Sequence, residues 1–218
     1  MNANYDETFQ KRLEEIRKSG KRPTLFLHAC CGPCLCYPLS ILLDDFDVTV
    51  GFINPNIRPL AEYEKRNWTL QSFLQRYVRD RGKKVSFVLV PEDFEGYDEK
   101  MKGREKDREG GAHCLLCHAY RISLSYRYAH DHGFDFFTTV MTVSCKKPSR
   151  ELNEIAEKMA VLFPGTEYLY SDFKKRDGQL KGIRLSKEYN LYRQDYCGCL
   201  WSLQERKAYL KAKEEIIG

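Results

Sequence analysis

Residues 24–34, which read TLFLHACCGPC, decide the fold of this chain. The first six are mostly apolar and have the length of a short buried strand, whereas Gly32 and Pro33 delay the helix that follows. We therefore expect a strand over 24–29, a loop that carries the cysteines, and a helix that includes 41–43. Cysteines placed in this way lie at the carboxyl end of a strand, where open α/β sheets bind their ligands.

The rest of the chain repeats this alternation of strand and helix. Further strands are predicted over 47–53, 84–90 and 134–141, and helices over 5–19, 59–81, 114–132, 148–163 and 199–215. Strands separated by helices favour a parallel sheet. The sequence thus predicts a single α/β domain over 1–218, with a Rossmann-like parallel sheet flanked by helices.

One stretch, residues 92–110, differs from the rest because 13 of its 19 residues are charged. Runs of charge usually lie in solvent, so we expect a solvated helix or loop there.

Composition excludes several classes of protein. The chain has 218 residues, with 36 Lys and Arg against 31 Asp and Glu, a net charge of +5. Charged residues at 31% exclude an integral membrane protein, and apolar residues at 42% exclude a disordered chain. Residues 23–43 lack charge but contain three prolines, a glycine and four cysteines, so they do not suit a membrane span. Four acids in the preceding 22 residues do not suit a secretory leader, and we expect a cytoplasmic protein with reduced cysteines.

Nine cysteines, most of them clustered, need an explanation. The first group is HACCGPCLC, residues 28–36, in which Cys31–Cys34 matches the thioredoxin tetrad. A thioredoxin-like exchange enzyme remains an alternative, but no Trp precedes the motif and most other cysteines stay unexplained. The neighbouring thiols of Cys30 and Cys31 are better suited to a metal, since a disulfide between adjacent residues is strained.

The second group is HCLLCH, residues 113–118, in which Cys114 and Cys117 lie at the start of a predicted helix. Together with Cys30 and Cys31 they supply four thiolates, the number that a [4Fe–4S] cluster needs. A structural zinc site also uses four thiolates and stays an alternative. The two cysteine pairs of such a site usually resemble each other, however, and here they do not.

The third group is YCGC, residues 196–199, and it is not needed to complete four ligands. Gly198 frees the backbone between Cys197 and Cys199, which can close as a reactive disulfide or bind one metal ion through both sulfurs. Cys34, Cys36 and Cys145 are then left over, and Cys34 is the first substitute for any of the four cluster ligands. A cysteine-rich metal site at the carboxyl ends of the strands is therefore predicted.

These motifs resemble the epoxyqueuosine reductase family called QueH. The resemblance rests on HACCGPC (28–34), HCLLCHAYR (113–121), YRQDYCGCLWS (192–202) with the preceding SDFKKRDG, and NPNIRP (54–59) after the second strand. It covers nearly the whole chain. One departure is Cys145 in TVSCKKP, where the family tends to have proline.

The resemblance implies the last step of queuosine synthesis, in which an epoxide on a modified guanine in tRNA is reduced to an alkene without cobalamin. It also implies that Cys30, Cys31, Cys114 and Cys117 hold a [4Fe–4S] cluster, and that Cys197 and Cys199 form the redox-active catalytic pair.

The chemistry needs two electrons. Cys197 and Cys199 store two electrons as a dithiol; alternatively they bind a second, mononuclear iron together with a carboxylate, for which Asp172 is the first candidate. The chain has no GxGxxG dinucleotide fingerprint and no flavin signature. We expect the electrons to come from an external one-electron donor such as a ferredoxin or flavodoxin.

A basic segment, residues 173–187, carries six Lys or Arg against one acid, with aromatic residues flanking it. Cations beside stacking rings suit an unstacked RNA base, although a solvated basic loop would look the same. We expect it to bind the tRNA anticodon loop at the wobble base, and the segment from about 165 to 218 to complete the active site. The candidate tRNA-binding residues are Lys174, Lys175, Arg176, Arg184, Tyr192 and Arg193.

Two other functions remain open. Iron–sulfur enzymes of tRNA thiolation also combine cysteines with basic surfaces, but they usually carry a pyrophosphate loop where this chain reads ACCGPC. A zinc-stabilised RNA-binding module without catalysis is the alternative that is not an enzyme.

Overall fold

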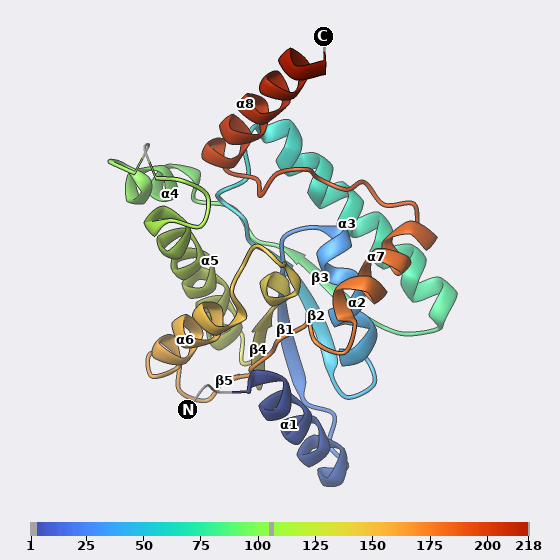
Figure 1. Ribbon diagram of the computed structural model, residues 1–218. Coiled ribbons are helices and arrows are strands. Elements are labelled where there is room, and N and C mark those ends of the chain that lie inside the picture. Colours follow the sequence, from blue (N-terminus) through green and yellow to red (C-terminus); the bar gives the residue numbers. More distant parts are fainter. Residues whose placement is uncertain (1–3, 105–106, 218) are drawn as a thin grey trace.

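The computed structural model describes residues 4–104 and 107–217 and shows a sheet with helices on both faces (Figure 1). The described strands lie in the order β3-β2-β1-β4-β5, and every neighbouring pair is parallel. Their bounds are β1 Thr24–Ala29, β2 Asp47–Phe52, β3 Ser86–Leu89, β4 Phe136–Thr139 and β5 Glu167–Tyr168. This order is that of Rossmann folds, in which successive strands are added on one side of β1 and then on the other. The predicted α/β class is confirmed.

The helices cover the two faces of the sheet. Figure 1 shows α2, α3 and α7 on one face and α5 and α6 on the other. The bounds are α1 Tyr5–Ser19, α2 Gly32–Leu42, α3 Leu60–Arg81, α4 Phe94–Met101, α5 Ala112–Asp131, α6 Ser149–Ala160, α7 Gly178–Glu188 and α8 Leu200–Ile217, with a 3₁₀ turn, η1, at Val140–Val143. None of the described helices has the length and apolar character needed to cross a membrane.

The alternation of side chains along β1 explains why both faces are covered. Leu25 and Leu27 join a core formed with α1, α2 and α3, whereas Phe26 points to the opposite face and joins a core formed with α5 and α6. All three side chains are fully buried. Because successive residues of a strand point to opposite faces, an apolar run of this kind requires helices on both sides.

Three features differ from the sequence-based expectation. The predicted strand over 134–141 ends at Thr139, where η1 follows. Strand β5 was not predicted, because it is too short to show the hydrophobic alternation of a strand. Helix α7 occupies much of the basic segment, which had no assigned helix. Its Gly178 lies so close to the Tyr37 ring of α2 that a Cβ would not fit, so tertiary packing rather than helix propensity decides this element.

The charged run is only partly solvated. Most of its described charged side chains are exposed, as predicted for a solvated helix, but α4 buries the apolar side chains of Tyr97 and Met101. Residues 105–106 of the run lie outside the described residues.

Residues 189–199, which we call the strap, connect α7 to α8 and run along α3 (Figure 1). Side chains of α3 hold it: Arg76 donates to the Tyr189 carbonyl at 2.7 Å, and the Tyr192 hydroxyl donates to Glu62 at 2.9 Å. At its far end, the backbone N–H of Arg58 donates to the carbonyl of Gly198 at 2.7 Å. The strap thereby brings the third cysteine group back to the sheet.

Candidate functional site

The first cysteine group lies where β1 ends and α2 begins. Cys31 is the N-cap of α2, and its Sγ accepts the backbone N–H of Cys34 at 3.4 Å. The sulfurs of Cys31 and Cys34 are 2.7 Å apart and those of Cys30 and Cys31 are 4.0 Å apart; all three lie within 4.8 Å of one another. The N-terminal end of a helix favours negative charge, so the loop is suited to thiolates. Thiolates in turn can bind a metal ion.

Cys30 is the most acidic thiol of this group. Hydrogen bonds from Cys31 and Cys34 hold its pKa well below the usual value, and the positive charges of Arg121 and Lys147 act in the same direction. Burial has the opposite effect on Cys31 and raises its pKa to about 12. The loop is therefore arranged to carry negative charge at Cys30.

The second cysteine group lies in the first turn of α5. The Cys114 sulfur accepts the backbone N–H of Gly110 at 3.2 Å, and burial raises the pKa of this thiol to about 12. Cys117 is buried and lies on the side of α5 that faces the protein interior. A cavity of about 110 Å³ is lined by Cys114, His118, Lys147 and Cys197, so the second and third groups face the same space.

The third cysteine group is held in place through Gly198. This residue has φ +132°, and a Cβ there would lie 3.1 Å from Arg66 Nη1 and from Ile57 Cγ1. Arg66 donates through Nη1 to the Cys197 carbonyl at 2.8 Å and through Nη2 to the Tyr196 carbonyl at 3.1 Å. Cys199 lies at the start of α8, where its sulfur accepts the backbone N–H of Ser202 at 3.5 Å.

One buried and one half-buried cation, Arg121 and Lys147, lie among the three groups. Arg121 is only 1% exposed, bonds Asn54 Oδ1 through Nη2 at 2.6 Å, and has no partner for its Nε. Burial disfavours its charge, but the sulfurs of Cys117, Cys30 and Cys197 act in the opposite direction, and the net effect raises its pKa. Burial also acts against the charge of Lys147, and the same sulfurs of Cys197 and Cys30 again act to raise its pKa. A buried cation needs an anion nearby, and Cys30, whose pKa is lowered, can supply it.

Comparison with known proteins identifies the family. Residues 25–205 match the family model described as epoxyqueuosine reductase QueH. The chain belongs to the QueH family. It is 35% identical over 199 residues to the epoxyqueuosine reductase QueH of Streptococcus pyogenes serotype M1, a match that covers 91% of this chain and 78% of that protein.

More distant QueH proteins match over similar lengths. The epoxyqueuosine reductase QueH of Staphylococcus epidermidis is 32% identical over 205 residues, covering 93% of this chain and 86% of that protein. The protein of the same name from Thermotoga maritima is 30% identical over 185 residues, covering 84% of this chain and 92% of that protein. The resemblance seen in the cysteine motifs is therefore confirmed.

The pairing of the cysteine sulfurs bears on the predicted disulfide. All nine are free thiols in this structure, which gives no support to a Cys197–Cys199 disulfide. Cys36 is fully buried and bonds the Gly32 carbonyl, as a core residue would, and Cys145 is exposed.

The predicted tRNA-binding residues of this QueH-family chain fall into two classes. Lys175, Arg184 and Arg193 are exposed. The others have protein partners: Lys174 pairs with Asp172 at 3.0 Å, Arg176 pairs with Asp6 at 3.1 Å, and Tyr192 bonds Glu62 and lies under Lys65. Asp172 is not part of the Cys30, Cys31 and Cys34 group, and its role as a metal ligand stays a prediction.

Several site residues were not found from the sequence. Asn54 follows β2, donates to the Ala29 carbonyl at 2.9 Å and bonds Arg121, so it connects the ends of two strands to the buried cation. Its backbone N–H donates to Glu92, and burial raises the pKa of that carboxyl to about 7. The NPNIRP motif was a sequence signal for Asn54. Glu92 was one of many charged residues in 92–110, and nothing in the sequence distinguished Arg66 or Arg121 from other arginines.

Proposed function

We propose that this chain reduces epoxyqueuosine in tRNA to queuosine, the last step of queuosine synthesis. The observation that carries the proposal is the convergence of three cysteine groups, distant in sequence, around Arg121 and Lys147 in a chain of the QueH family. Cys30 follows the central strand, and sheets with this strand order bind ligands at that edge.

The donor set suits an iron–sulfur cluster. Soft thiolates are the usual ligands of such clusters, and a cluster with four thiolates carries net negative charge. The buried guanidinium of Arg121, with its unpartnered Nε, and the half-buried Lys147 supply compensating charge. We assign Cys30, Cys31, Cys114 and Cys117 as ligands of a [4Fe–4S] cluster, with Cys34 as the alternative because its sulfur belongs to the first group. The cluster would supply electrons singly.

The reaction balances with the residues named. Opening the epoxide to an alkene consumes two electrons and two protons and releases its oxygen as water. The dithiol of Cys197 and Cys199 provides both electrons and both protons as its sulfurs join, and an external carrier such as a ferredoxin or flavodoxin reduces them again. In the alternative form, these sulfurs and Asp172 would hold a mononuclear iron that would polarise the epoxide oxygen, and the external carrier would supply both electrons by way of the cluster. Neither form uses cobalamin. Arg66 and Gly198 fix the pair in position.

The tRNA would approach over the C-terminal part of the chain, from about residue 165 to 218. An anticodon loop presents its wobble base unstacked, so little energy is spent on extruding it. Lys175 and Arg184 are free to neutralise phosphates because they are exposed. Replacing Lys175 and Arg184 with Ala should weaken tRNA binding and flatten its salt dependence, as measured at two salt concentrations, without changing iron content. An unaltered affinity would place the tRNA surface elsewhere.

The deciding experiment combines iron and sulfide analysis of anaerobically purified protein with turnover of epoxyqueuosine-containing tRNA under a strong reductant. A brown protein that forms queuosine supports the proposal. A colourless zinc protein that binds tRNA without turnover would instead indicate an RNA-binding module, and incorporation of sulfur into tRNA would indicate a thiolation enzyme.

A further inference from the structure

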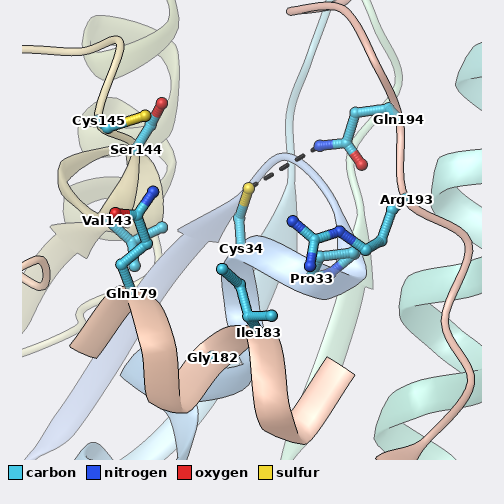
Figure 2. Close-up of a pocket in the computed structure, with 10 residues that line it drawn as sticks. All are labelled: Pro33, Cys34, Val143, Ser144, Cys145, Gln179, Gly182, Ile183, Arg193 and Gln194. Atoms are coloured by element: carbon cyan, nitrogen blue, oxygen red, sulfur yellow. Dashed lines mark hydrogen bonds between the residues drawn. The ribbon is translucent and has the colours of Figure 1, made fainter. Parts of the chain in front are cut away.

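A cavity of about 150 Å³ lies over Cys34, between the cysteine loop, α7 and the strap (Figure 2). Pro33, Val143 and Ile183 give it apolar walls. The Cys34 sulfur lies on its floor, 2.7 Å from the sulfur of Cys31. The space therefore opens directly onto the first cysteine group.

Two amide side chains and one guanidinium line this cavity: Gln179 from α7, and Gln194 and Arg193 from the strap (Figure 2). Gln194 is anchored, because its Nε2 donates to the Cys31 sulfur at 2.9 Å. The side chains of Gln179 and Arg193 have no hydrogen bond or ion pair with any residue in the described part of the chain. Their polar groups are available to a ligand.

We propose that this cavity binds the modified guanine itself, and that Gln179 and Arg193 are the side chains that hold the base. The proposal rests on the proposed function, since it names where the substrate of that reaction sits. A Gln amide offers an acceptor and a donor side by side, which match the N–H and carbonyl of the guanine ring, and a guanidinium can donate to the carbonyl oxygen. The apolar walls contact the faces of the ring.

The size of the cavity limits how much of the base it encloses. A closed cavity of about 150 Å³ holds a single benzene ring, so one edge of the bicyclic base enters this open-sided cavity and the rest stays outside. The base, entering through the open side, would therefore leave its ribose and phosphates outside. A base held in this way lies beside the Cys34 sulfur, at the edge of the first cysteine group.

The test compares two tRNA probes that differ only at the wobble position, one with epoxyqueuosine and one with guanine, by fluorescence anisotropy under anaerobic conditions. Gln179→Leu removes the amide, and Ile183→Trp fills the cavity. Their controls are Gln75→Leu and Val161→Trp, which make the same changes at exposed positions. Thermal unfolding and iron content of each variant are measured in parallel.

We expect the wild type to prefer the modified tRNA, and Gln179→Leu and Ile183→Trp each to reduce that preference about tenfold while the controls retain it. Gln179→Glu, which keeps an acceptor but loses the N–H, should behave like Gln179→Leu. If wild type turns over the modified tRNA but these variants keep the full preference, the base binds elsewhere, and the cavity beside Cys114 and Cys197 is the next candidate. If wild type shows neither preference nor turnover, the proposed function fails, and the cavity assignment fails with it.

Discussion

Gly198→Ala is the sharpest test of how the strap positions the third cysteine group. A methyl group there would occupy a backbone conformation that L residues rarely adopt, and it would lie 3.1 Å from Arg66 Nη1. That nitrogen donates to the Cys197 carbonyl at 2.8 Å, so the contact is relieved only by moving a buried guanidinium from its acceptor.

The expected cost follows from these two effects. The backbone conformation costs about 1–3 kcal/mol, and a weakened hydrogen bond of a buried charged group costs about 1–3 kcal/mol. For a chain of this size, a loss of 1 kcal/mol lowers Tm by about 2–4 °C, so the variant should melt roughly 5–20 °C lower. Turnover should fall further than the loss of folded protein explains, because the Cys197 and Cys199 sulfurs move.

The measurements are calorimetric unfolding and turnover at a temperature where the variant is fully folded. Gly82→Ala is the matched control, since Gly82 also has positive φ, +60°, but nothing lies within 4 Å of its added Cβ. It should lose about 1 kcal/mol of stability and keep its turnover. Wild-type stability and turnover in Gly198→Ala would refute the reasoning, as would an equal loss of turnover in both variants.

Three further predictions concern the cysteines and Glu92. In a colorimetric iron assay, Cys30→Ala should have lost most of the iron and Cys145→Ala should have kept it. If the Cys34→Ala protein is colourless but the Cys30→Ala protein stays brown, Cys34 rather than Cys30 is the ligand. Cys197→Ser should abolish turnover and keep the brown chromophore. If its iron content is unchanged, the pair acts as a dithiol, whereas loss of about one iron per chain indicates a second iron site. Loss of the whole cluster would contradict both forms. Burial raises the pKa of Glu92 to about 7, above its unfolded value, so the folded state binds the extra proton and stability should fall as pH rises from about 4.5 to about 7. Glu92→Gln should flatten that dependence in denaturant titrations, and an unchanged slope would contradict it.

Local pattern determined much of the fold. The apolar run over 24–29 became β1, and the predicted helix over 5–19 has the observed bounds, with Phe9 and Leu13 buried as its spacing predicts. These elements could be predicted because burial on one or both faces leaves a period in the sequence. The grouping of the cysteines, and the family they indicate, likewise depend only on short-range spacing.

Only the tertiary structure decided how the three cysteine groups and the buried arginines come together. Helix α7 could not be read from its glycines and lysines, because Gly178 serves close packing against Tyr37, a residue far away in sequence. Arg66 and Arg121 look like any surface arginine in the sequence, and only the fold buries them and surrounds Arg121 with thiols from three separate segments. Sequence spacing reports contacts a few residues apart, whereas a buried charge is fixed by the long-range contacts that desolvate it and supply its partner.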